Sequence, residues 1–157
     1  MARRRAGTTR QFSQSVNKWT KESMERSEMA FQNGLLDFYD ALADATPVDT
    51  GNLRNSLVAT VNGNTTTVTG PGNTSQDSTY RSGAESSIAN IMSAKLGDKV
   101  SFMYNAVYVL AQNYGFTGYD SLGRFRNTPG KFWIERVGSR YKSIMRGAAT
   151  RLKMAMK

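Results

Sequence analysis

Three aspartates at helical spacing are the side chains of this sequence with the clearest potential for chemistry. Asp37, Asp40 and Asp44 are separated by three and four residues, which places them on one face of a helix. Carboxylates grouped in this way can bind a hard cation such as Ca²⁺. Because they alternate with apolar residues of the same segment, the more frequent explanation is the solvated side of an amphipathic helix. We therefore predict no metal site and no cofactor.

Two residue types on which many active sites depend are missing from the 157 residues. The sequence contains no histidine and no cysteine. This removes the commonest general base, the thiolate nucleophile and the commonest ligands of transition metals, and it excludes disulfides. Catalysis by carboxylates or lysine stays open, but the composition favours a protein that is not an enzyme.

The net charge of +9 is concentrated at the two ends of the sequence. Residues 1–10 contain four arginines and no acidic residue, and residues 131–157 contain eight lysines or arginines against Glu135 alone. Such ends suggest a nearby polyanion, most simply nucleic acid contacted through its phosphates, although solvated termini would give the same pattern. No apolar run approaches the roughly 20 residues that span a bilayer, and no apolar segment follows the first arginines, so we expect neither a membrane segment nor a secretory signal.

Helical periodicity positions most of these residues. We predict a flexible basic arm over residues 1–10 and a single α+β domain over residues 11–157. The domain begins with a long helix, because Phe12, Val16 and Trp19 fall at i, i+4 and i+7. The stripe continues through Phe31, Leu35, Phe38, Leu42 and Ala45. Gly34 lies inside this helix and indicates either a bend or close packing.

β-Branched residues and turn formers dominate the middle of the sequence. Residues 57–61 and 65–69 flank an Asn-Gly-Asn segment, which predicts a β-hairpin, and residues 100–103 form a third strand. We expect loops at residues 70–83 and 115–130 and a short helix at residues 84–96. A C-terminal amphipathic helix is predicted from the apolar stripe Ile134, Val137, Tyr141, Ile144, Ala148, Leu152 and Ala155.

The corner between the first helix and the first strand is the most distinctive segment. Pro47 stops the helix, Asp49 and Thr50 can bond nearby backbone N–H groups, and Gly51 can take a positive φ. We expect Arg54 to project towards a carboxylate or a carbonyl. The order Pro47, Val48, Asp49, Thr50, Gly51, Leu53, Arg54, Ser56 and Leu57 resembles the signature of the tail-completion, or head–tail connector, family of tailed bacteriophages.

Two further patches extend this resemblance over roughly residues 30–157. The segment from Tyr104 to Gly115 is similar to a family segment that forms a short helix after a strand. An acidic residue usual there is replaced by an amide, Gln112 or Asn113. The residues from Pro129 to Trp133 are similar to the family's aromatic entry into its last helix.

The resemblance implies a structural virion protein of the phage neck or tail end. Family members of this kind form a ring, here with six or twelve copies, that joins or completes the tail around the DNA channel. Its partners would be neighbouring connector and tail proteins and packaged DNA, and it would be made in the host cytoplasm. We expect contacts with DNA or an acidic partner at Arg3, Arg4, Arg5, Arg10, Arg140, Arg146 and Arg151. Candidate subunit contacts are Thr65, Thr67, Tyr80, Arg124 and Arg126.

One alternative function of a different class remains. A small basic accessory protein that binds nucleic acid without sequence preference would have the same charge distribution. A monomer or dimer without ring symmetry would favour this alternative.

Overall fold

The computed structural model describes residues 5–48, 51–63, 77–120 and 122–155, without the side chains of residues 5–8 and 77–83. The described chain mixes helices with two small antiparallel sheets, which confirms the α+β prediction. The helices are α1 (Arg5–Ala45), α2 (Asn52–Asn55), α3 (Asp77–Ser93), α4 (Val109–Tyr114), α5 (Trp133–Ser139) and α6 (Tyr141–Ala155). The strands are β1 (Leu57–Val61), β2 (Val100–Tyr104), β3 (Gly115–Tyr119) and β4 (Phe125–Pro129).

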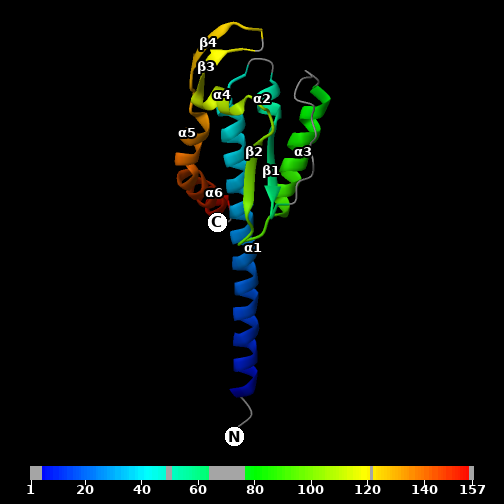
Figure 1. The fold of residues 1–157 in the computed structure, drawn as a ribbon. Coiled ribbons are helices and arrows are strands. Elements are labelled where there is room, and N and C mark those ends of the chain that lie inside the picture. The colour runs from blue at the N-terminus through cyan, green and yellow to red at the C-terminus, as the bar shows by residue number, and fades with distance from the viewer. Residues whose placement is uncertain (1–4, 49–50, 64–76, 121, 156–157) are drawn as a thin grey trace.

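Helix α1 is the axis of the fold and is 41 residues long, about 60 Å. Its C-terminal half is surrounded by the other elements, whereas its N-terminal half projects away from them (Figure 1). The helix begins at Arg5, so Arg5 and Arg10 lie within α1, and the expectation of an arm over residues 1–10 that precedes the first helix is wrong for residues 5–10; no proline interrupts them. Arg3 and Arg4 lie outside the described residues. At the other end, α1 stops at Ala45, two residues before Pro47, as expected.

Strand β1 is paired with a strand along one edge and covered by a helix along the other. It pairs antiparallel with β2, with Ala59 opposite Phe102. The other edge of β1 is covered by α3, because Ser87 Oγ accepts a hydrogen bond from Ala59 N (3.1 Å) and Asn90 Nδ2 donates one to Ala59 O (3.0 Å). These are the backbone groups that a hairpin partner would bond. The predicted partner, residues 65–69, lies outside the described residues.

The main core fills the space between α1, the β1–β2 sheet, α3 and α5. Leu35, Leu42, Leu57, Ile91 and Val137 are all buried there. The C-terminal half of the predicted α1 stripe therefore does form core. Phe38 extends this core, since its ring makes edge contacts with the rings of Phe102 and Tyr141, each with 5.2 Å between centroids.

Three predicted element boundaries are wrong. Helix α3 begins at Asp77, so residues 77–83 are helical and not part of a loop. Residues 115–130 are not a loop but the β3–β4 hairpin, in which Tyr119 faces Phe125. The predicted last helix is divided at Arg140 into α5 and α6, where Gly138 and Ser139 supply weak helix propensity.

Candidate assembly surfaces

The corner after α1 is a structural support for the body. Gly51 has φ 79° at the start of α2, the positive value for which glycine is suited. Arg54 Nη2 donates to Asp44 Oδ1 at 2.9 Å, which confirms that Arg54 projects towards a carboxylate. This ion pair links α2 to the end of α1. Asp49 and Thr50, the predicted capping residues, lie outside the described residues, and Pro47 is half-buried.

A buried polar chain behind the corner was not foreseen from the sequence. Trp133, with no exposed surface, donates from Nε1 to the Tyr104 hydroxyl at 3.2 Å. The same hydroxyl lies 2.7 Å from Thr46 Oγ1 and donates to Leu42 O at 3.2 Å. Burial raises the pKa of Tyr104. These hydrogen bonds connect α5, β2 and the end of α1 through the hydroxyl of Tyr104.

Asn113 is buried and joins α4 to α5. Its Nδ2 donates to both carboxylate oxygens of Glu135, at 3.0 and 2.9 Å, and its Oδ1 accepts from Ile134 N at 3.4 Å. Hydrogen bonds from Tyr114 and Asn113 lower the pKa of Glu135. An amide–carboxylate contact therefore holds the start of α5.

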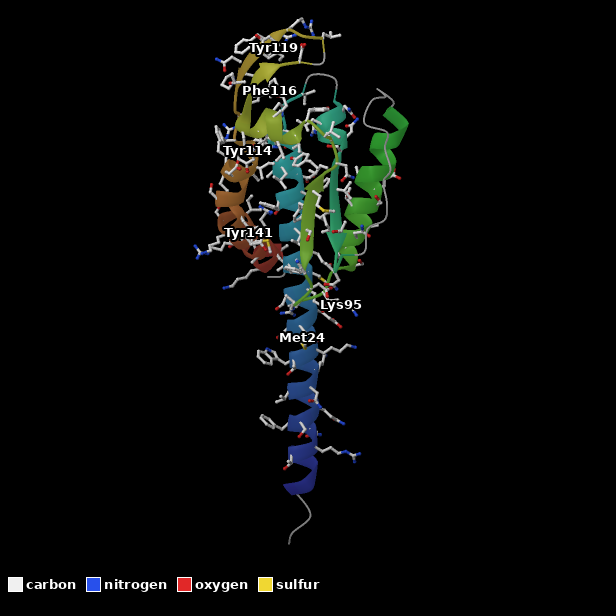
Figure 2. All side chains as sticks on the ribbon, viewed as in Figure 1. Met24, Lys95, Tyr114, Phe116, Tyr119 and Tyr141 are labelled. Atoms are coloured by element: carbon white, nitrogen blue, oxygen red, sulfur yellow. The ribbon has the colours of Figure 1, made fainter. Side chains whose placement is uncertain are left out.

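The carboxylate of Asp120 makes several hydrogen bonds at the exposed end of the β3–β4 hairpin. Asp120 Oδ1 accepts hydrogen bonds from the backbone N–H groups of Leu122 and Arg124, and its Oδ2 accepts from the Nε atoms of Arg124 (2.9 Å) and Arg126 (3.2 Å). These contacts lower the pKa of Asp120, the backbone bond from Arg124 most. Tyr119 and Phe125 pack edge to face beside the turn and are mostly exposed. Figure 2 shows Phe116 and Tyr119 on this hairpin, at the end of the body opposite the projecting helix.

The predicted contact residues therefore fall into separate groups. Arg124 and Arg126 come together at the hairpin tip, as partners of Asp120. Tyr80 lies in α3 with an undescribed side chain, and Thr65 and Thr67 lie outside the described residues.

Among the described residues, the arginines predicted to contact DNA or an acidic partner lie in two separate regions of the subunit. Arg10 is exposed on the projecting part of α1, and Arg5 lies at the start of that helix with an undescribed side chain. Arg140 and Arg146 are exposed and form no ion pair with any described residue, whereas Arg151 pairs with Asp37. Figure 1 shows the N-terminal end of α1 far from α6. One subunit thus presents two separate basic regions.

Two of the three aspartates of the possible cation site form ion pairs with arginines. Asp37 pairs with Arg151 and Asp44 with Arg54. Partial burial, then the charges of Asp44 and Asp37, raise the pKa of Asp40. Within residues 5–48, 51–63, 77–120 and 122–155 there is no group of acidic residues that could hold a metal ion. In the same residues, no helix is both long and apolar enough to cross a membrane.

The largest departure from the predicted core is an exposed apolar row on α1. Phe12 and Trp19 are each 69% exposed and Val16 is 41% exposed, although all three fit the predicted stripe. We call these three residues the apolar row.

Searches against family models, curated proteins and solved structures found no match to this chain.

Proposed function

We propose that the chain is a structural subunit of the neck or tail end of a tailed phage, where copies form a ring around the DNA channel. The observation that supports this most is the amount of apolar side chain left uncovered by the single subunit. The apolar row and the aromatic pair Tyr119 and Phe125 lie at opposite ends of the molecule, and all are exposed. Contiguous exposed apolar groups of this kind mark association surfaces.

The proposal of a phage neck protein rests on the resemblance of residues Pro47 to Leu57 to the signature of the tail-completion family. Among the described residues from Pro47 to Leu57, Arg54 links α2 to the end of α1 and Gly51 begins α2, which suits a motif that shapes a subunit rather than an active site. With no histidine or cysteine in the sequence, we propose a structural role and no catalysis.

Phage particles provide the direct test of this function. Antibody-gold labelling of particles from a phage that carries the gene should place the chain at the junction between head and tail. Deleting the gene should yield filled heads and separate tails, because the joint is missing. Label on the capsid shell or at the tail tip, or normal joined particles without the protein, would contradict the proposal.

The basic residues of α6 support a second candidate function. Lys142, Arg146 and Lys153 are exposed, and so is Arg140 just before the helix; none of the four forms an ion pair with a described residue. A free monomer could bind duplex DNA through them without reading sequence. Salt-sensitive binding of any duplex by a protein that never forms rings would favour this function over the first.

A further inference from the structure

The apolar row lies on a definite face of α1. Steps of four and three residues from Trp19 lead through Ser23 and Ala30 to Gly34. Helix α6 covers that same face in the body, since Met145 lies against Gly34. The row is therefore the continuation, beyond the body, of a face that elsewhere packs on another helix.

The surroundings of the row suit burial. Thr9, Ser15 and Thr20 flank it, and the hydroxyls of Ser15 and Thr20 donate to the carbonyls of Gln11 and Val16, at 3.0 and 2.9 Å. Because these donors are already bonded, covering them costs little. The ion pair of Lys21 with Glu25 lies on the side of α1 opposite the row, whereas the pair of Lys18 with Glu22 borders it, because Glu22 follows Trp19 by three residues.

The body offers an apolar groove of about 380 Å³ where α1 leaves it. Its lining includes residues of three elements and one residue between elements. They are Phe31 and Phe38 of α1, Val100 and Phe102 of β2, Lys99 just before β2, and Tyr141 of α6. Figure 2 shows Tyr141 beside α1, and Lys95 at the end of the body from which α1 emerges. The groove has room for an aromatic side chain.

A subunit cannot fill its own groove with its own row. Phe31 follows Trp19 by twelve positions of continuous helix, which is a distance of about 18 Å along α1. The occupant must therefore come from another molecule.

The charges along α1 favour a second copy of the same subunit as the molecule that fills the groove. Residues 5–21 contain four basic residues and no acidic one, whereas residues 22–45 contain six acidic residues and one basic one. The row lies in the basic half, and the part of the groove on α1 lies in the acidic half. The projecting half of one copy thus complements the body half of the next.

We infer that the projecting half of α1 docks on the neighbouring copy and places the apolar row, with Trp19 as its anchor, in that copy's groove. The two contact surfaces are different parts of one chain, so the contact is heterologous and each copy can receive one neighbour and reach another. Two aromatic side chains and a valine supply about 400–600 Å² of the roughly 800 Å² per partner typical of a specific interface. The inference rests on the proposed ring and names the contact that closes it.

Cross-linking of single-cysteine variants tests the contact cleanly, because the chain has no cysteine of its own. Ser15→Cys lies beside the row and leaves it intact, and Lys99→Cys lies in the groove. Mixed under a short bis-maleimide reagent, the two variants should form a dimer that contains one of each. The double variant should form a ladder of products up to the full ring. Asn17→Cys, on the opposite side of α1, should give no product with Lys99→Cys.

Three results would overturn the inference. The first is the formation of rings without a cross-linked product between Ser15→Cys and Lys99→Cys. The second is cross-linking only between two copies of Ser15→Cys. The third is a yield of product with Lys99→Cys that is the same for Asn17→Cys as for Ser15→Cys. A ladder from a protein that is absent from phage particles would instead contradict the proposed function and leave the contact standing.

Substitution within the row gives a second readout. Trp19→Ser should raise the concentration needed for assembly at least tenfold and leave the melting temperature of the monomer unchanged. Met24 is 60% exposed and lies off the row, so Met24→Ser should assemble like the unaltered protein. Assembly of Trp19→Ser at the unaltered concentration would count against the anchor.

Discussion

A Cβ atom built on Gly34 would lie 2.5 Å from Met145 Sδ, so the absence of a side chain at Gly34 is what allows α6 to cross α1 so closely. This contact sets the face of α1 that α6 covers. It also resolves the two sequence interpretations of Gly34, a bend or close packing, in favour of close packing.

Gly34→Val should therefore destabilise the subunit. The new branched side chain forces Met145 and α6 outwards, at a cost of about 1–3 kcal/mol in the free energy of unfolding. Met145→Ala in the same chain removes the clashing atoms and should recover part of that loss. Urea denaturation of the four proteins of the double-mutant cycle measures the coupling. An equal cost of Gly34→Val with and without Met145 would show that the two side chains do not meet.

Tyr104→Phe should cost about 1–3 kcal/mol, because it leaves Trp133 Nε1 without its acceptor in a buried site. Tyr141→Phe, whose hydroxyl lies on a more exposed ring, should change stability by less than about 0.5 kcal/mol. Thermal unfolding followed by circular dichroism compares them. Similar losses from both substitutions would contradict a central role for the Tyr104 hydroxyl.

The raised pKa of Tyr104 adds a dependence on alkaline pH. Burial is its main cause, so the folded state holds the phenol proton more tightly than the unfolded state. The stabilisation is complete below the unfolded pKa of about 10 and is lost as pH rises through the higher folded value. Between pH 9 and 11, the melting temperature of Tyr104→Phe should fall less than that of the unaltered protein. Parallel curves would refute this dependence.

Asp120→Asn should loosen the β3–β4 hairpin by removing the charge that holds Arg124 and Arg126. Amide hydrogen exchange across residues 115–129 should become faster, while Glu85→Gln should leave it unchanged. The pKa of Asp120 is lowered in the folded state, so its contribution is present above the unfolded pKa of about 3.9 and is lost as pH falls through the folded value. Unchanged exchange in Asp120→Asn at neutral pH would show that the carboxylate does not order the tip.

Replacing Arg3, Arg4 and Arg5 with serine should leave folding intact and weaken assembly or retention of DNA. Arg140→Gln combined with Arg146→Gln tests the α6 surface in the same way. If α6 faces DNA, each lost arginine should reduce the slope of log affinity against log salt by about one. Lys21→Gln serves as a control, since Lys21 already pairs with Glu25. Normal particle yield and DNA retention at low and high salt would place these arginines away from DNA.

Periodicity predicted the helices and strands whose residues repeat regularly. The stripe from Phe31 to Ala45 and strands β1 and β2 lie where the pattern indicated. The short helix α4 was expected from the family resemblance of the segment from Tyr104 to Gly115, and not from periodicity. The pattern did not reveal which half of α1 is covered, because burial depends on elements distant in sequence. Phe12 and Leu35 fit the same stripe, yet only Leu35 meets a sheet and a second helix.

Side-chain contacts between distant segments account for the other errors. The edge of β1 is closed by Ser87 and Asn90, and neither residue looks like a strand partner in the sequence. Hairpin β3–β4 depends on Asp120 binding two arginines and on Tyr119 meeting Phe125, while its glycines suggested a loop. The Asn113–Glu135 contact joins residues 22 positions apart and has no periodic signal. The direction of the Arg54 side chain could be predicted, because only a short corner separates Arg54 from Asp44, the carboxylate that it binds.

Electron-microscopy images of the purified full-length protein test the central claim, assembly into a closed ring, most directly. At concentrations where Trp19→Ser remains monomeric, class averages of the unaltered protein should show closed rings with one fixed rotational symmetry, of six or twelve copies, around an open centre. Only monomers, twofold dimers or open filaments across the accessible concentration range would contradict it.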